Sequence, residues 1–432
     1  MDLKLLNLRR NTLKASFLYG RSRVEVELPD ENLIGVLKTS RLSSSKDEEY
    51  EVRCSLENPV TPFIKKGSKA LLIVTDYTRA TPLSKILPPV IQKLKEKGFN
   101  EFTVLVANGL HEPASQNQLE ELLGGKVFEE AQIVNHDASK TDELTYLGET
   151  SWGTPLWVNS RLFEVDLRIG IGTVEPHFFA GYSGGGKIIL PGVSGVETIY
   201  RNHSYAMINH PGSRLGVLDK NIIYRDICEA ANASELDGVV NVVLGMEGGV
   251  SKCFSGDPIK AHRSAVDFIE RFIKVEAERR ADIVVVSGGG YPADRNLYQA
   301  VKGMAVGEQL VKTNGVIVLL AECCDGVAHE HFYQLVSKFK NPIALLKHIR
   351  EHEPIRDQWE AQIMARILTK SRIVVYAKGV TTKELENMML IPASSPEEAL
   401  EIAFSLTSRD AKLLAVPEGT HIIPEVPESN NT

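Results

Sequence analysis

The sequence has few cysteines, and their spacing excludes the commonest cysteine-based sites. Five cysteines occur in 432 residues, scattered and without a C-x-x-C pair. An odd number of scattered cysteines argues against a disulfide framework and is typical of a reducing compartment. Cys323 and Cys324 follow the apolar run 316–321, so we expect both to be buried structural thiols.

The chain also lacks a surplus of positive charge and a long apolar stretch. Its formal net charge is −7 at pH 7, which argues against a nucleic-acid-binding protein. No stretch of about 18 apolar residues predicts a transmembrane helix, and residues 1–6 lack the apolar core of a signal peptide. We therefore expect a cytoplasmic protein with neither a membrane nor a nucleic acid as partner.

What the sequence does contain is a regular alternation of apolar strand-like runs and helical segments. At 432 residues, with 43% hydrophobic and 24% charged residues, two or three globular domains are expected. The alternation predicts an α/β fold with mainly parallel sheets. The expected strands are a hairpin at 15–19 and 24–28, then 70–75, 102–107, 131–134, 166–172, 239–245, 282–287, 315–320, 371–376 and 411–417. The expected helices are 83–97, 116–123, a long connector at 260–280, one starting near 294, and 396–406.

Several polar residues lie directly after expected strands. They are Asp76, Arg79, His111 and His136. Ligands of open parallel sheets bind beyond the carboxyl ends of the strands. Chemistry is therefore expected at this edge, although an ion pair between Asp76 and Arg79 that merely caps a helix is an equally good interpretation.

The most unusual stretch is 177–192, which holds a histidine, a glycine-rich turn and Lys187. Glycines let a backbone approach a phosphate or a flat ring, and a desolvated lysine is a nucleophile. The segment Gly181–Lys187 also fits the phosphate loop G-x-x-x-x-G-K, but Ile188 stands where that loop needs Ser or Thr for Mg²⁺. A nucleotide-dependent phosphotransferase, a non-catalytic nucleotide or organic-acid binding protein and a purely structural turn stay open as alternatives.

Other motifs are weak when taken singly. The histidines at 111, 177 and 203 show no zinc-ligand spacing. The segment 287–290 follows a strand but does not match G-x-G-x-x-G, so a tight turn is the simpler interpretation. Gln299 and Lys302 share one helical face and could reach one ligand. His329 and His331 point apart on an expected helix, which predicts surface residues.

Taken together, these residues form a family pattern. They are Asp76-x-x-Arg79-x-x-Pro82, Gly109-x-His111, Pro176-His177-x-x-Ala180-Gly181-x-Ser183-Gly184-Gly185-x-Lys187-x-x-Leu190-Pro191-Gly192, Asn202-His203, Tyr298-Gln299-x-x-Lys302 and Trp359. In order and spacing the sequence resembles the nickel-dependent lactate racemase family, also called the nickel-pincer 2-hydroxyacid racemases and epimerases. The block 176–192 is the most specific part of the match.

The resemblance implies a fold and a cofactor. It implies two α/β domains facing each other across an active-site cleft. The cofactor would be the nickel-pincer nucleotide, a pyridinium mononucleotide with thioamide and thiocarboxylate arms that carries Ni(II). Lys187 would hold it covalently, His203 would be the protein ligand to nickel, and Ni(II) suits such soft tetragonal donors. The further cofactor contacts would be Ser183, Gly184, Gly185 and Gly186.

The resemblance also implies an activity, the inversion of carbon 2 of a 2-hydroxy acid through a 2-keto acid. His111 and His177 would be the acid/base pair, since histidine titrates near neutrality. Arg79 would clamp the substrate carboxylate, and Asp76 would orient Arg79 or a cofactor hydroxyl. The remaining substrate-binding residues would be Tyr298, Gln299, Lys302 and Trp359.

Substrate, domain limits and partners follow less directly. The family's lactate enzymes commonly carry an arginine after the first catalytic histidine, whereas Glu112 stands here, so lactate, malate-like, aromatic and sugar acids stay open as substrates.

We expect domains at 1–272 and 273–408, with 409–432 returning to the N-terminal domain. The expected partners are the 2-hydroxy acid and the cofactor-building proteins. The oligomeric state is left open, a homodimer included.

Overall fold

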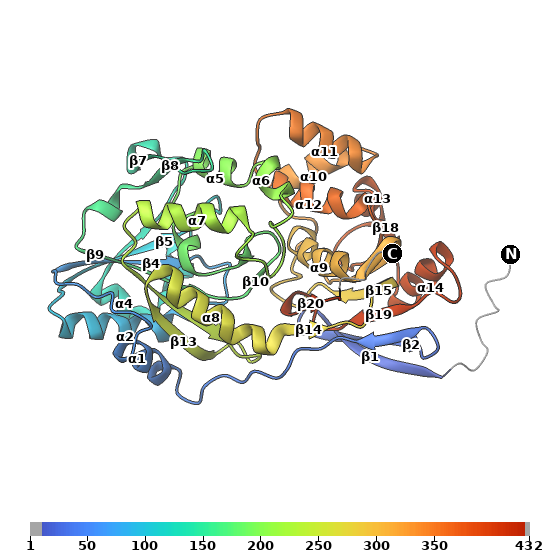
Figure 1. Ribbon diagram of the computed structural model, residues 1–432, viewed down its shortest axis with the longest axis horizontal. Coiled ribbons are helices and arrows are strands. Elements are labelled where there is room, and N and C mark those ends of the chain that lie inside the picture. The colour runs from blue at the N-terminus through green and yellow to red at the C-terminus, as the bar shows by residue number, and fades with distance from the viewer. Residues whose placement is uncertain (1–10, 428–432) are drawn as a thin grey trace. The chain divides into compact units, whose positions relative to one another are not determined.

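The computed structural model describes residues 11–427, which form two compact units. The central unit comprises residues 40–272, and the terminal unit comprises residues 11–39 together with 273–427. Each unit has its own six-stranded sheet, so each is built around its own core. Figure 1 shows the elements of both units.

The central unit is a mainly parallel sheet in the order β13-β12-β9-β4-β5-β6. Only its edge strand β13 is antiparallel to its neighbour. The strands are β4 (Lys69–Thr75), β5 (Glu101–Ala107), β6 (Gln132–Asn135), β9 (Leu167–Thr173), β12 (Gly238–Leu244) and β13 (Val250–Gly256), with two hairpins, β7 (Leu144–Glu149) with β8 (Pro155–Asn159) and β10 (Pro176–His177) with β11 (Gly181–Tyr182).

Helices cover both faces of this sheet. The α-helices are α1 (Glu48–Glu57), α2 (Leu83–Glu96), α3 (Gln116–Leu123), α4 (Gly125–Glu130), α5 (Val196–Asn202), α6 (Tyr205–Asn209), α7 (Ile222–Ala233) and α8 (Pro258–Ile273), and the 3-10 turns are η2 (Thr141–Glu143), η3 (Ser160–Phe163) and η4 (Gly185–Ile188). In Figure 1, α1, α2 and α4 gather on one side of the sheet and α7 lies on the other. The central strands therefore read as continuous apolar runs, because both of their faces are buried.

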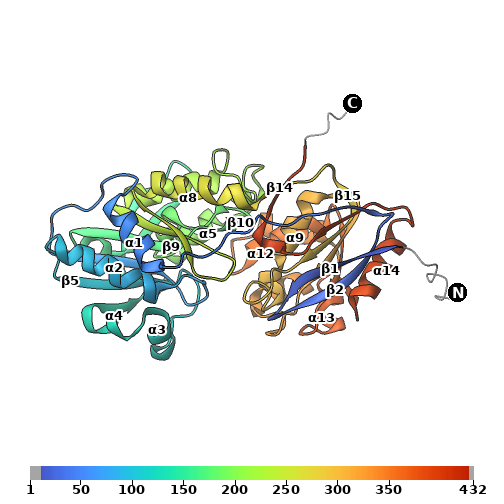
Figure 2. The ribbon, with the colours of Figure 1, turned by 90° about the horizontal axis from the view of Figure 1, so that it is seen from below.

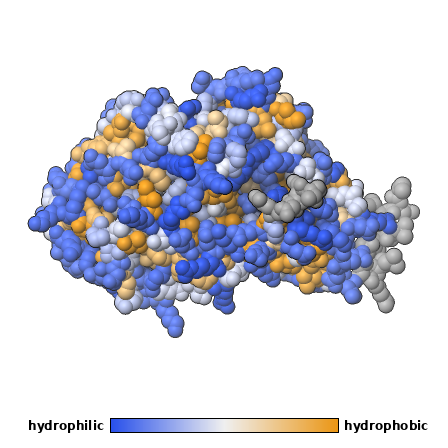
Figure 3. All heavy atoms as spheres, viewed as in Figure 1, coloured by the Kyte–Doolittle hydropathy of each residue, from blue (hydrophilic) through white to orange (hydrophobic). Residues whose placement is uncertain are grey.

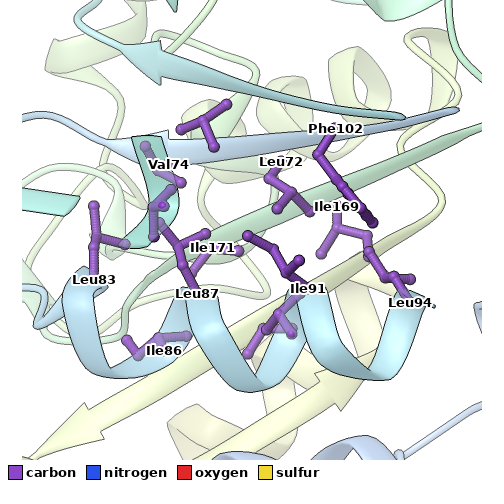
Figure 4. Packing of buried hydrophobic residues seen from close by; sticks show 14 of the residues in the cluster. Leu72, Val74, Leu83, Ile86, Leu87, Ile91, Leu94, Phe102, Ile169 and Ile171 are labelled. Atoms are coloured by element: carbon purple, nitrogen blue, oxygen red, sulfur yellow. The ribbon is translucent and has the colours of Figure 1, made fainter. Parts of the chain in front are cut away.

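The core beneath α2 shows why this region folds as it does. Leu83, Leu87, Ile91 and Leu94 recur at helical spacing and are fully buried. They pack against side chains of β4, β5 and β9, as Figure 4 shows. Each such side chain contributes about 1.5–3 kcal/mol by leaving water, so this face fixes α2 and, with it, the loop 76–82 that precedes it.

The terminal unit has a fully parallel sheet in the order β18-β17-β16-β15-β19-β3. The β1–β2 hairpin and α14 pack on one of its faces, and they lie side by side in Figure 2. The strands are β1 (Thr12–Tyr19), β2 (Ser22–Pro29), β3 (Leu33–Val36), β14 (Lys274–Glu276), β15 (Ala281–Ser287), β16 (Val311–Leu320), β17 (Arg372–Tyr376), β18 (Ile391–Ala393), β19 (Leu413–Val416) and β20 (Ile423–Glu425). The helices are α9 (Leu297–Leu310), α10 (Glu330–Ser337), α11 (Pro342–Glu351), α12 (Gln358–Leu368), α13 (Thr382–Asn387) and α14 (Pro396–Leu406), with the turn η5 (Gly419–His421).

The α/β class with mainly parallel sheets is confirmed, and the expected limit between residues 272 and 273 agrees with the two units, but the two ends of the chain were assigned wrongly. Residues 11–39 do not join the central unit, because β3 pairs with β19 at the edge of the terminal sheet. Residues 409–427 stay in the terminal unit, since β19 pairs with β15 and β20 pairs with β14. Both ends of the described chain thus belong to the terminal unit, which local patterns do not reveal.

Two smaller expectations were wrong. The connector helix expected at 260–280 ends at Ile273, where the short strand β14 begins and pairs with β20. Cys323 is buried as expected, whereas Cys324 is exposed, because the turn after β16 carries it to the surface. All five cysteines are free thiols.

The surface is mixed in polarity. The face in Figure 3 is mostly hydrophilic, with small hydrophobic areas scattered over it. Among residues 11–427, no helix combines the length and the apolar character needed to cross a membrane.

Candidate functional site

Three neighbouring strands of the central unit bring four of the expected site residues to one edge, namely Asp76, Arg79, His111 and His177. Strands β9, β4 and β5 lie side by side in this order and in parallel, so the segments that follow them begin at the same edge. Two contacts tie these segments together. The hydroxyls of Thr81 and Thr173 are 2.8 Å apart, and the Gly109 N–H donates to the Gly192 carbonyl at 2.9 Å.

Asp76 and His111 form a hydrogen-bonded pair at this edge. The Asp76 side chain is buried, and its Oδ2 lies 2.7 Å from His111 Nδ1. Burial alone would raise the pKa of Asp76, but the hydrogen bond and charge of His111, followed by Arg79 and Thr78, lower it to about 2. The ionised carboxylate accepts the Nδ1–H of His111, so whenever this ring is neutral its Nε2 is left as a proton acceptor.

The partner of Asp76 differs from the sequence expectation. Its second oxygen, Oδ1, accepts from the Thr78 N–H at 2.7 Å and the Thr78 hydroxyl at 2.5 Å. Both oxygens are therefore engaged by His111 and Thr78, while Arg79 acts on Asp76 through its charge. Asp76 thus orients His111. The expected clamping of a carboxylate by Arg79 stays a prediction.

The ring of Phe179 is shared by three of the expected residues. Its centroid lies 4.5 Å from that of His177, 5.1 Å from that of His203 and 5.7 Å from the Lys187 ammonium. The β10–β11 hairpin that pairs His177 with Gly181 sets this arrangement. Within it the Ala180 N–H donates to His177 Nδ1 at 3.2 Å, so a neutral His177 carries its proton on Nε2.

His203 is buried directly after α5. Burial, together with the positive charge of Lys187, lowers the pKa of His203 to about 3. The imidazole is therefore neutral at physiological pH, which is the state that binds metals. In the part of the chain that the structure describes, no group of three or more His, Cys, Asp or Glu side chains is placed to hold a metal ion.

The glycine-rich turn is enclosed by protein. A Cβ on Gly184 would lie 2.7 Å from Val174, and one on Gly185 would lie 2.8 Å from the ring of His262. The Gly185 N–H donates to Asn241 Oδ1 at 2.9 Å, and the Ser183 hydroxyl donates to the Thr173 carbonyl at 2.8 Å. These contacts give Ser183 and the glycines a packing role that holds Lys187 in place. Their contact with a cofactor stays a prediction.

The same turn departs from a phosphate loop in shape. A phosphate loop leads straight into a helix whose N-terminus faces the phosphates. Here η4 spans only Gly185–Ile188, and the next α-helix begins at Val196. The geometry therefore does not favour the phosphotransferase alternative.

Replacing Gly185 with alanine should destabilise this turn. Gly185 has φ +55°, and the new Cβ would meet the buried His262 ring, so we expect a loss of about 2 kcal/mol or more in the free energy of unfolding. Gly326→Ala is the matched control, because Gly326 has φ +70° and its new Cβ would make only an ordinary contact, 3.7 Å from the Gly379 carbonyl. Urea unfolding should show the larger loss for Gly185→Ala, and equal losses would contradict the packing role.

Sequence reasoning missed two supports of the turn. His262 of α8 is buried, and its Nε2–H donates to the Ser183 carbonyl at 2.9 Å. Burial lowers the pKa of His262 to about 4, so it acts as a neutral donor. Asn241 could have been noticed from the sequence, because it is a polar residue inside the apolar strand β12. No local pattern marks His262.

His136, expected near the chemistry, has a structural role. Its ring is completely buried, and Nε2–H donates to the Ser194 carbonyl at 3.0 Å. The Asn159 amide donates to Nδ1 at 3.2 Å. Both ring nitrogens are therefore used inside the protein, and burial lowers the pKa of His136.

The other expected substrate-binding residues form a group within the terminal unit. On α9, the Lys302 ammonium donates to Gln299 Oε1 at 2.6 Å. From α12, the Trp359 indole N–H donates to the Tyr298 hydroxyl at 3.0 Å. The structure thus joins these four residues in pairs, and their contact with a substrate stays a prediction.

His329 was expected at the surface, and the structure places it differently. His331 is exposed, but His329 is half-buried and its ring stacks on Tyr298 with centroids 3.9 Å apart. His329 has φ +48° and lies just before α10, so the expected helical geometry does not apply to it. Its Nδ1 lies 3.1 Å from Asp357, which fixes the ring against Tyr298.

Comparisons with known proteins cover almost the whole chain. Residues 19–216 match the family described as the lactate racemase N-terminal domain, and residues 275–424 match the lactate racemase C-terminal domain. The chain is 36% identical over 417 residues to the lactate racemase of Thermoanaerobacterium thermosaccharolyticum, covering 94% of this chain and 97% of that protein. It is 32% identical over 416 residues to the lactate racemase of Lactiplantibacillus plantarum, covering 94% and 98%.

Solved structures agree with these matches. The lactate racemase apoprotein from Thermoanaerobacterium thermosaccharolyticum superimposes with a TM-score of 0.92 at 34% identity, over 96% of this chain and 100% of that one. A protein from Thermotoga maritima shares the fold, with a TM-score of 0.67 at 19% identity over 88% of this chain and 99% of that one.

Proposed function

This chain belongs to the lactate racemase family and is an isomerase, and from that premise we propose that it inverts carbon 2 of lactate or a related 2-hydroxy acid through a 2-keto acid. The observation that carries the proposal is the opposite hydrogen bonding of two histidines in the central unit. His111 gives its Nδ1–H to Asp76, whereas His177 receives the Ala180 N–H on Nδ1.

This opposite bonding supports an acid/base pair. His111 Nε2 is set to take the proton of the substrate hydroxyl, and the ionised Asp76 stabilises the imidazolium that results. His177 carries its proton on Nε2 and is set to return one. Because inversion must handle the hydroxyl proton of both enantiomers, the two rings would exchange roles when the reaction runs in the opposite direction.

The residues around Phe179 fit a nickel-pincer nucleotide. His203 offers a neutral, buried imidazole close to Lys187, and a single imidazole suits nickel that already has soft donors. We propose that Lys187 holds the nucleotide covalently and that His203 binds the nickel. When bound, the group would supply the remaining donors to nickel and an acceptor for the hydride of carbon 2.

The remaining roles concern the substrate. We propose that Arg79 binds the carboxylate of the 2-hydroxy acid, and that Tyr298, Gln299, Lys302 and Trp359 also contact the substrate. Exclusion of water would protect the hydride during transfer. We further propose a cytoplasmic location, where cofactor-building proteins would load the chain.

A substrate panel tests this function. The chain, produced together with cofactor-building proteins, is incubated with single enantiomers of lactate, malate-like, aromatic and sugar 2-hydroxy acids, and the products are separated by chiral chromatography. We expect the opposite enantiomer or epimer to form from at least one acid. A loaded chain that leaves every acid unchanged would contradict the proposal and favour a binding protein.

A further inference from the structure

A buried carboxylate on α7 collects three hydrogen-bond donors from distant segments. Asp226 is completely buried. It accepts from the Thr150 hydroxyl at 2.6 Å, the Thr154 hydroxyl at 2.8 Å and the Asn202 amide at 2.7 Å. A buried carboxylate is costly unless it is well bonded, so this network holds its donors firmly.

The donors come from two places with different roles. Thr150 and Thr154 belong to the turn between β7 and β8. Asn202 is the last residue of α5 and directly precedes His203. Asp226 therefore fixes the end of α5 from which the His203 ring projects.

The turn after β7 also binds both helices at its surface. The Arg201 side chain of α5 donates to the Gly153 carbonyl at 3.0 Å. The Ser151 N–H and hydroxyl donate to Glu229 of α7 at 2.7 and 2.5 Å. Glu229 lies one turn beyond Asp226 on α7, and both of these hydrogen bonds join it to Ser151 and not to α5.

Helix α7 supports Lys187 as well. A Cβ on Gly186 would lie 3.0 Å from the Ile227 carbonyl and 3.0 Å from the Ala231 side chain, so η4 packs tightly on α7. Ile227 is the residue next to Asp226. One turn of α7 thus sets the position of both Lys187 and the end of α5.

We propose that Asp226 is a positioning residue for His203, acting through the Asn202 amide to hold the imidazole at a fixed place relative to Lys187. The proposal rests on the proposed role of His203 as nickel ligand. Residues that orient a metal ligand affect metal retention even though they do not touch the metal. Asp226 makes no contact with substrate in this account.

The test replaces Asp226 with Asn and uses Glu229→Gln as the matched control. Both variants neutralise one carboxylate on the same helix, but only D226N disturbs the bond to Asn202. In chains loaded with cofactor, the ratio of nickel to covalent adduct on Lys187 is measured by elemental analysis and mass spectrometry. We expect D226N to lose nickel at least about tenfold faster on dilution into chelator, with E229Q close to wild type.

A second readout does not depend on activity or loading. In chains made without cofactor, nitrogen-15 NMR reports the tautomer and surroundings of His203, assigned with a His203→Gln variant. D226N should shift the His203 signals while E229Q leaves them in place. Asn202→Ala removes the same link and retains the carboxylate with its two threonine donors, so it should reproduce the shift even where D226N folds poorly.

The outcomes separate this proposal from the proposed function. If D226N and N202A leave the His203 signals and nickel retention as in wild type, the positioning role is wrong. If the wild-type chain takes up no nickel, the assignment of the cofactor fails, while the NMR comparison still decides whether Asp226 positions His203.

Discussion

Replacing Lys187 with alanine is expected to abolish the covalent adduct, the bound nickel and the racemase activity together. In the proposed function the Lys187 amine is the attachment point of the cofactor, so without this amine the covalent bond to the nucleotide cannot form. The Lys187 side chain lies beside Phe179 and close to His203, and neither neighbour supplies another amine. Mass spectrometry of the intact chain and elemental analysis measure the two losses, and chiral chromatography measures the third.

Two further variants sharpen this prediction. Lys187→Arg keeps the positive charge but offers no amine of the same reactivity, so it should be as inactive as K187A. Lys126→Ala, at an exposed position of α4, should keep the adduct and the activity. Racemase activity in either Lys187 variant would show that the lysine acts only through its charge or packing, and the proposed attachment would be wrong.

Replacing Asp76 with asparagine is expected to lower kcat on the order of 100-fold, the scale of one acid/base contribution. In the proposed reaction, the 2.7 Å hydrogen bond between Asp76 and His111 would stabilise the imidazolium that forms when His111 takes a proton. Asparagine keeps the size but removes the negative charge. Steady-state rates from each enantiomer should fall, and a variant with the wild-type kcat would contradict the proposed stabilisation of the His111 imidazolium by the charge of Asp76.

The same pair also affects stability, with a defined dependence on pH. Because the pKa of Asp76 is lowered from 3.8 to about 2, its ionised form stabilises the folded chain by about 2 kcal/mol. That stabilisation is complete above pH 3.8 and is lost as the pH falls through 2. Urea unfolding should show D76N less stable than wild type at pH 7, with the difference shrinking below pH 4. Asp142→Asn, at an exposed position, is the control.

The inner strands of both sheets and the sheet class could be predicted because burial leaves a local pattern, whereas the edge strands β3, β13 and β18 were missed. Runs such as residues 70–74 in β4 are apolar throughout, as expected for strands covered on both faces. Which strands pair with one another could not be predicted from local sequence patterns. The union of β3 with β19 joins residues nearly the whole chain apart, and only the completed terminal sheet explains it.

In the candidate site too, some features could be predicted from the sequence and others could not. The sequence indicated His111, His177, Lys187 and His203 as a set, and all four belong to the central unit, three of them around Phe179. The contact that orients His111 could not be predicted, since it joins residues 35 positions apart in sequence. Asp76 was expected to orient Arg79 or a cofactor hydroxyl, whereas in the fold its Oδ2 lies 2.7 Å from His111 Nδ1.

The supporting residues were the least predictable part. His262 and Asp226 lie in helices whose periodicity explains them equally well as ordinary interior positions. Their importance follows from which atoms they meet, namely the Ser183 carbonyl and the Asn202 amide. Only the packed structure supplies that information.

The fate of the hydrogen on carbon 2 tests the central claim most directly. Single-enantiomer lactate carrying deuterium at carbon 2, or another acid accepted in the panel, is converted in ordinary water by the loaded chain, and the inverted product is analysed by mass spectrometry. We predict that the product retains its deuterium, because in the proposed reaction the hydride would leave and return without exchanging with water. A product that has exchanged deuterium for solvent hydrogen would show removal of carbon 2's hydrogen as a proton, and the account would be wrong.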